Sequence, residues 1–278
     1  MTTLTRHTNR TVPACVLGLL TGLIGPPTFA EGSPSVSLGY EYTTGKYGQN
    51  VDTSIVSIPV TMNIIRDAWR YTLTVPYISV TGNGTVIPGT GGAMTFENFS
   101  GGFFGGGGGG GMMGSSTQTV TNSGLGDVVA SAAYGFFPEQ AFYEVSAKIK
   151  FATADADKGL GTGENDYYFQ LDGLVGTDTA QPFFTLGYVI TGDPAGFSFK
   201  DVPYGSLGLM IKTGASSSLG LSYDYRQSSV SGSDDVSQAS VFIDWETSTR
   251  ISLGLSATTG FSDSSPDAGF GLNLSRRF

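Results

Sequence analysis

The amino-acid sequence predicts an all-β chain that crosses a membrane as an antiparallel β-barrel of about 12 strands, with short turns at one end and long outer loops at the other. Three features lead to this prediction. The chain begins with an apparent export segment, its later segments alternate apolar and polar residues, and the connections between those segments alternate between short and long.

The first thirty residues have the pattern of a secretory signal peptide. Arg6 and Arg10 precede a short apolar run over 12–24, and residues 28–30 place small side chains before an expected cleavage site. The alternative is a membrane anchor, which needs about 20 apolar residues, and this run is interrupted by Pro13. We therefore expect residues 1–30 to be removed and residues 31–278 to form the barrel.

Removal of that segment would take away His7 and Cys15, the single His and the single Cys of the chain. The mature protein would then lack a Ser-His-Asp triad, a thiolate nucleophile and imidazole or thiolate metal ligands. We accordingly expect no enzymatic activity and no cofactor. Barrel phospholipases and proteases depend on His, so an outer-membrane hydrolase is the weakest alternative, with Ser-Lys chemistry left formally open.

The composition is that of neither a soluble domain nor a nucleic-acid-binding protein. Charged residues make up 13 % of the chain, about half of the usual share in soluble domains. The mature chain would hold 12 basic and 23 acidic residues, and 12 − 23 gives a net charge of −11. Binding to nucleic acid requires a basic surface, so we expect no nucleic-acid partner.

Strand-like segments of roughly ten residues follow, which is near the length that a tilted strand needs to cross a bilayer. In one of them Leu219, Leu221 and Tyr223 share an apolar face, and polar residues lie between them. The middle of each apolar face lacks charged residues, as contact with lipid requires. The expected strands begin near Ser35, Thr53, Trp69, Gly126, Ala141, Asp166, Phe183, Tyr204, Ser217, Val236, Arg250 and Ala268.

The ends of these segments carry two further barrel signals. Aromatic residues of the apolar face gather near the strand ends, as in the aromatic girdles at membrane interfaces. Short connections near 66–67, 138–139, 177–180, 214–215 and 247–248 alternate with longer ones, as periplasmic turns alternate with outer loops. The last strand ends in Phe278, which resembles the assembly signal of outer-membrane barrels. We therefore expect outer-membrane lipid and the barrel-assembly machinery as partners.

The intervening positions of the strands would face an enclosed interior. Six charged residues of this parity are the candidate lumen-lining residues: Glu144, Lys148, Lys150, Asp172, Asp224 and Arg226. Their mixed signs allow two interpretations, which the sequence leaves open. One is a polar passage, and the other is an interior blocked by salt bridges.

The longest connection, the Gly-rich outer loop over 81–123, is an outlier. A run of glycines at 105–111 is flanked by the candidate gate residues Phe103, Phe104, Met112 and Met113. Consecutive glycines do not hold one conformation cheaply, so the simpler interpretation is a disordered loop. The sharper hypothesis is a mobile gate whose side chains fold over the mouth.

The next long loop contains four acidic residues that we consider as candidate metal ligands: Asp155, Asp157, Glu164 and Asp166. Their spacing fails the EF-hand pattern, because no Gly stands at its turn position. A divalent-cation site and a solvated acidic loop both remain open.

Several short motifs resemble one outer-membrane family. Residues 75–77 (Val-Pro-Tyr), 124–127 (Gly-Leu-Gly-Asp), 148–155 and 159–163 look like the family associated with the meta-cleavage pathway of phenol degradation. The resemblance implies a barrel that passes small organic compounds, aromatic ones among them. It offers no catalytic residues, and the poly-Gly segment departs from the family's pattern.

Together these observations predict a porin-like outer-membrane channel or transporter for passive passage of small organic, including aromatic or hydrophobic, solutes. The alternative is a structural or adhesive barrel whose long loops bind a partner.

Overall fold

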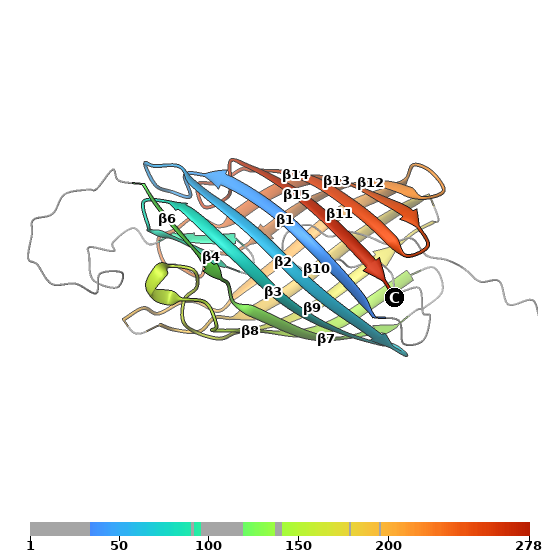
Figure 1. The fold of residues 1–278 in the computed structure, drawn as a ribbon, viewed down its shortest axis with the longest axis horizontal. Helices are drawn as coiled ribbons and strands as arrows, with labels where there is room; N and C mark the ends of the chain where they lie inside the picture. Colours follow the sequence, from blue (N-terminus) through green and yellow to red (C-terminus); the bar gives the residue numbers. More distant parts are fainter. Residues whose placement is uncertain (1–33, 90–91, 96–118, 137–140, 178, 195) are drawn as a thin grey trace, which may run out of the picture.

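The computed structural model describes residues 34–89, 92–95, 119–136, 141–177, 179–194 and 196–278. The chain forms a closed antiparallel β-barrel whose strands cross the wall obliquely (Figure 1). Across the described ranges the sheet has 13 strands, of which β6 and β7 share a single span beside β3, so the barrel has twelve spans. The predicted fold class is confirmed.

The strand bounds agree closely with the alternation in the sequence. The spans are β1 (Ser35–Gly45), β2 (Thr53–Arg66), β3 (Trp69–Gly82), β6 (Val120–Leu125) with β7 (Val128–Phe136), β8 (Ala141–Phe151), β9 (Asp166–Val175), β10 (Ala180–Ile190), β11 (Val202–Lys212), β12 (Ser217–Arg226), β13 (Val236–Ser248), β14 (Ile251–Gly260) and β15 (Ala268–Arg277). Consecutive spans pair with each other, and β1 pairs with β15 to close the barrel.

The break between β6 and β7 has a local cause in the neighbouring strand. Pro76 of β3 has no backbone N–H and cannot donate to the ladder. Its carbonyl accepts a hydrogen bond of 2.9 Å from the Gly126 N–H. On the two sides of this point Tyr77 pairs with Leu125 and Thr74 pairs with Val129, so β6–β7 has one extra residue relative to β3. The result is a β-bulge, and the fourth span begins earlier than the predicted Gly126.

The two ends of the barrel differ as predicted. Arg277 at the end of β15 pairs with Ser35 at the start of β1, so both ends of the barrel domain lie together, at the end that carries the short turns (Figure 1). One predicted turn is displaced. β13 continues through the predicted turn at 247–248 to Ser248, where a bulge precedes the turn at 249–250. The predicted turn at 138–139 lies outside the described residues.

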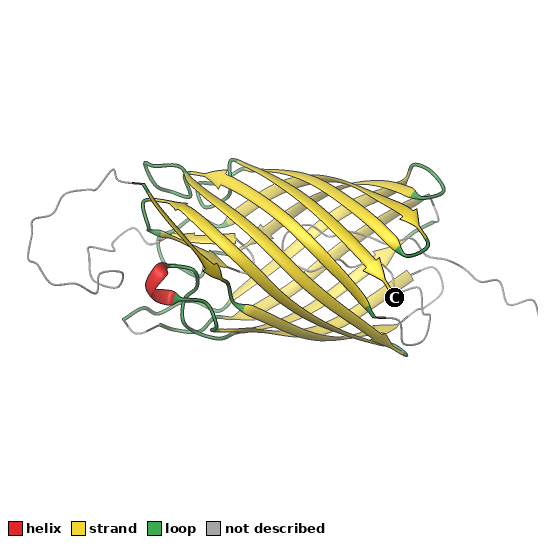
Figure 2. Cartoon of the chain, in the orientation of Figure 1, coloured by secondary structure: helices red, strands yellow, loops and turns green. Residues whose placement is uncertain are grey.

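The opposite end carries the long loops and two small elements. Within the expected loop 81–123, β3 continues to Gly82, β6 begins at Val120, and β4 (Val86–Gly89) pairs with β5 (Gly92–Thr95) as a hairpin. The loop 152–165 holds the 3-10 helix η1 (Ala156–Lys158), seen at this end in Figure 2. In the part of the chain that the structure describes, no helix has the length and apolarity needed to span a membrane.

The outer surface of the barrel is apolar and bordered by aromatic rings. Mid-strand residues such as Leu207 and Leu221 are 66 % and 59 % exposed on the isolated chain, which a soluble protein avoids at this scale. Near the short turns Trp69 stacks on Tyr71 and meets Tyr134 edge-on, with ring centroids 6.2 and 5.1 Å apart. Such a band with an interfacial girdle fits a lipid bilayer.

Candidate functional site: the barrel interior

Strand alternation places the polar residues inside the barrel. All six candidate lumen-lining residues belong to the inward parity of β8, β9 and β12. Five of them are nevertheless buried, at 2–5 % exposure, and Lys148 is half-buried. The structure therefore places these residues inside the barrel but packs most of them against other side chains.

The centre of the interior is a band of paired charges and hydrogen bonds. Arg70 reaches across β7 to form an ion pair with Glu144 of β8. The Asp172 carboxylate accepts hydrogen bonds of 2.6 Å from both Gln170 Nε2 and Thr185 Oγ1. Because buried charges are costly unless they are paired or hydrogen-bonded, these contacts make the buried carboxylates tolerable.

Two further charged residues of the interior are Lys148 of β8 and Asp224 of β12. Lys148 is half-buried, and its Nζ lies 4.5 Å from the centroid of the Tyr168 ring, a cation–π contact. Asp224 of β12 accepts a hydrogen bond of 3.2 Å from Ser222 Oγ. Arg226, on the same strand, donates to Ser229 Oγ at 3.5 Å.

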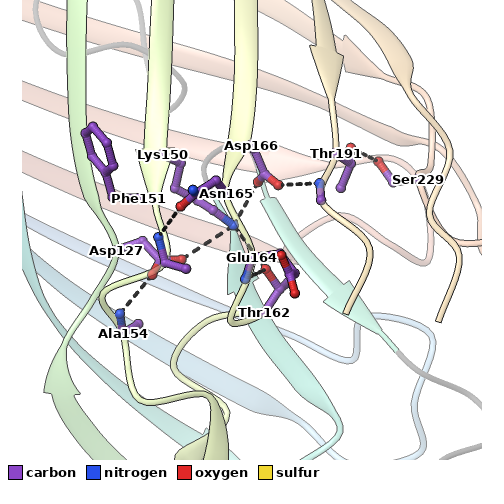
Figure 3. A network of polar contacts seen from close by, with 12 residues as sticks. Asp127, Lys150, Phe151, Ala154, Thr162, Glu164, Asn165, Asp166, Thr191 and Ser229 are labelled. Carbon is purple, nitrogen blue, oxygen red and sulfur yellow. Dashed lines mark hydrogen bonds and ion pairs between the residues drawn. The ribbon is translucent and has the colours of Figure 1, made fainter. Parts of the chain in front are cut away.

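Nearer the outer loops, Lys150 is enclosed by two carboxylates (Figure 3). Its Nζ lies 2.8 Å from Asp166 Oδ2 and 3.5 Å from Asp127 Oδ2, and it donates to Thr162 Oγ1 at 3.2 Å. Asp166 also accepts from the Gly192 N–H at 3.0 Å. This buried network joins the bulge before β7 and the strands β8 and β9 to the loops that follow β8 and β10.

The same network holds loop 152–165 in the mouth of the barrel. Asp127 Oδ1 accepts hydrogen bonds from the N–H groups of Thr153 and Ala154, at 3.0 and 2.9 Å (Figure 3). Leu160, at the far side of the loop, is 1 % exposed and packs on Ile78 and Val80 of β3. The bulge opposite Pro76 directs the Asp127 side chain into the barrel. There Asp127 binds the loop backbone and so positions the loop.

One part of the interior is apolar, which the alternation in the sequence does not predict. Phe142, Leu174, Phe183, Met210 and Phe242 form a buried cluster on the inward faces of β8–β11 and β13. The Phe242 ring covers Gly220 of the adjacent strand so closely that a Cβ there would overlap it. In the sequence, Phe142-Tyr143 and Phe183-Phe184 each place an aromatic residue on both faces of the strand. The alternation therefore does not tell which of the two rings faces inward.

Burial is uneven around the interior. We call the inward faces of β9–β13 the packed wall, because most of their side chains are buried, including Gln170, Ser222 and Ser240 at 8, 2 and 2 % exposure. We call the inward faces of β14, β15, β1, β2 and β3 the open wall, because many of their polar side chains are half-buried. These include Glu41, Ser57, Asn63, Thr72, Ser256 and Asn273.

Comparisons with known proteins agree with this architecture. No family model and no curated protein matches the chain. The COG4313 outer membrane channel from Pseudomonas putida F1 is similar in structure, with a TM-score of 0.63 and 12 % identity over 90 % of this chain and 97 % of that chain. The chain shares the fold of outer-membrane β-barrels. The NanC porin has a TM-score of 0.53 at 9 % identity, over 87 % of this chain and 100 % of that chain.

The predicted resemblance to a transporter-like family of outer-membrane barrels is thus confirmed at the level of the fold. Its motifs also acquire a structural meaning in this barrel. Residues 75–77 and 124–127 form the two sides of the bulge, and residues 148–155 carry Lys150 and the backbone that Asp127 anchors. At Gly161, a Cβ would lie 2.8 Å from both the Asp127 carboxylate and the Ala154 side chain, so the close packing requires glycine.

The four candidate metal ligands are not brought together. Asp155 caps η1 and lies 3.1 Å from Lys158 Nζ, and the hydrogen bond from Lys158 holds the pKa of the Asp155 carboxyl below its usual value. Asp166 is bound to Lys150. Asp157 is exposed and Glu164 half-buried. Among the described residues, no group of three or more His, Cys, Asp or Glu side chains is placed to hold a metal ion.

The remaining candidate residues lie at the two ends. The candidate gate residues Phe103, Phe104, Met112 and Met113 lie outside the described residues. Phe278 is 57 % exposed, its N–H donates to the Pro34 carbonyl at 3.0 Å, and the Arg276 guanidinium lies 5.1 Å from its ring centroid. The terminal aromatic is therefore presented at the outer surface, beside the junction of β1 and β15.

Proposed function

We propose that the protein is a passive channel for small organic solutes in the outer membrane. The observation that supports it best is a closed barrel with an apolar exterior and, inside, a wall of half-buried Ser, Thr and Asn side chains. A barrel that served only as a scaffold would have no need of solvent-accessible polar side chains along its interior. The similar structures are the COG4313 outer membrane channel and the KdgM and NanC porins.

The proposal requires that solutes cross without an energy source. The test is to reconstitute the purified protein in liposomes and to measure release of small trapped solutes over a series of sizes. We expect release that is faster than from empty liposomes, that does not saturate and that falls steeply with solute size. Release no faster than from empty liposomes, with the barrel shown to be folded and inserted, would overturn the proposal.

We also propose that residues 1–30 are removed on export, that the terminal Phe278 is read by the assembly machinery, and that the mature barrel is not an enzyme. The absence of any His beyond His7 supports the last point. The mass of the protein extracted from outer membranes tests the cleavage site, since a mature chain should begin at Glu31. A phospholipase assay on the same material should give no turnover.

A further inference from the structure

The unequal burial of the two walls suggests where water enters the barrel. On the packed wall the inward polar side chains of successive strands are enclosed, as shown by Thr185, Ser206 and Ser218 at 4, 8 and 4 % exposure. On the open wall, which runs across the near side in Figure 1, buried inward side chains such as Ser37 are fewer. Side chains that face inward and still contact solvent must border a water-filled space.

The composition of the open wall differs from that of the packed wall. Its half-buried inward residues are mainly short hydroxyl and amide side chains. Thr72 Oγ1 donates to Asn63 Oδ1 on the neighbouring strand at 2.7 Å, and half-buried Thr74 lies 3.0 Å from the hydroxyl of the buried Thr61. The bulky inward rings of Phe183, Tyr204 and Phe242 all belong to the packed wall. The space left by short side chains therefore lies off the barrel axis, toward β15, β1 and β2.

One charged residue of the open wall differs from the charges of the central band. Glu41 of β1 pairs in register with Ser57 of β2 and with Gly271 of β15, so its neighbours on both sides are small. In the described part of the chain, no hydrogen bond or ion pair is formed by its carboxylate, and the residue is half-buried. By contrast, Glu144 and Asp172 are enclosed by their donors.

We infer that the water path runs off-centre along the open wall and that Glu41 is its specificity-determining charge. This inference rests on the proposed channel function. A fixed carboxylate beside a narrow path attracts cations and repels anions, while hydroxyl and amide groups bind neutral solutes that form hydrogen bonds. The path should therefore favour uncharged hydrogen-bonding solutes and small cations over anions.

The position of the path is tested by cysteine accessibility, because the chain's single Cys15 lies within the expected signal peptide. Ser57→Cys and Ser256→Cys place a thiol on the open wall, and Ser222→Cys and Ser240→Cys are matched controls on the packed wall. We expect a water-soluble thiol reagent to label the first pair and reduce their conductance, and to leave the second pair unchanged. Equal labelling of both pairs, or labelling of the control pair alone, would overturn the inference.

The role of Glu41 is tested by the reversal potential across a planar bilayer in a salt gradient. Glu41→Gln should shift the reversal potential toward anion permeability. Asp224→Asn removes an equal charge from the packed wall and should leave the reversal potential unchanged. No shift for Glu41→Gln, or the same shift for both variants, contradicts the assignment. If the unmodified protein conducts no ions, the proposed function fails first, whereas a conducting protein with the wrong labelling pattern refutes only the off-centre path.

Discussion

At the scale of single residues, the interior of this barrel is organised by what each charge contacts. Lys150 is enclosed between Asp127 and Asp166, and Arg70 is paired with Glu144. These residues were natural candidates for a solute path because they are charged and face inward. Their burial and pairing show that most of them join strands and a loop, and removal of one partner from such a buried pair is strongly destabilising.

Replacement of Lys150 by methionine should therefore destabilise the barrel. Lys150→Met leaves the Asp127 and Asp166 carboxylates without their shared cation, and we expect a loss of about 3–5 kcal/mol in the free energy of unfolding. Addition of Asp166→Asn should restore part of the loss, because it removes one of the two stranded charges. Urea unfolding in detergent or liposomes measures both. A double variant less stable than Lys150→Met would contradict this account.

Arginine substitutions at an outward-facing and at an inward-facing position should have different effects. Leu255 and Ser256 are neighbours in the middle of β14, with Leu255 on the lipid side and Ser256 on the open wall. Leu255→Arg should lower the free energy of unfolding by about 2–4 kcal/mol and impair membrane assembly, because the guanidinium would lie in hydrocarbon. Ser256→Arg should assemble normally, since its side chain reaches water. Folding yield in lipid vesicles, read by electrophoretic mobility without heating, compares the two variants, and equal damage in both would refute the assigned facing.

At the scale of elements, loop 152–165 is a fixed part of the mouth. Its first residues are held by Asp127 and its later part by Lys150, which donates to Thr162. Its middle is held by Leu160, which packs against Ile78 and Val80. The bulge that creates this arrangement arises because Pro76 cannot complete the ladder between β3 and β6–β7. The bulge thus places Asp127 where its carboxylate can anchor the loop.

Truncation of the apolar anchor should release the loop without unfolding the barrel. Leu160→Ala removes a side chain that is 1 % exposed, and we expect the free energy of local unfolding of the loop to fall by about 2–5 kcal/mol. Amide hydrogen exchange over 152–165 should become faster, while that of β9–β12 stays unchanged. Asp157→Ala, an exposed position in the same loop, is the control. Unchanged exchange in Leu160→Ala would show that the loop is held by its ends alone.

At the scale of the whole molecule, the barrel combines a uniform exterior with an uneven interior. The lipid requires every outward residue near the bilayer centre to be uncharged, and this requirement is strong enough to read from the sequence. Strand number, the starts of most spans and the direction of residues such as Leu221 and Ser222 follow from it. The alternation of short turns and long loops is set by the same topology.

The interior was less predictable because its contacts join strands that are distant in sequence. Arg70 and Glu144 are separated by 74 positions, and nothing in the local pattern pairs them. At Phe142 and Phe183 apolar residues occupy both faces of the strand, so the alternation does not show which side chains point inward. Glu41 pairs in register with Gly271, which lies near the opposite end of the chain. For these reasons the sequence predicts which residues face inward, but not which of them meet water.

The most direct test of this structure is a scan of β12 with nitroxide spin labels, placed one at a time at every position from Leu219 to Arg226 in lipid vesicles. Collision rates with oxygen, which concentrates in hydrocarbon, should peak at Leu219, Leu221, Tyr223 and Tyr225 and fall at the residues between them. The barrel predicts this period of two, in this phase. A period near 3.6, the opposite phase, or equal oxygen exposure at all eight positions would contradict it.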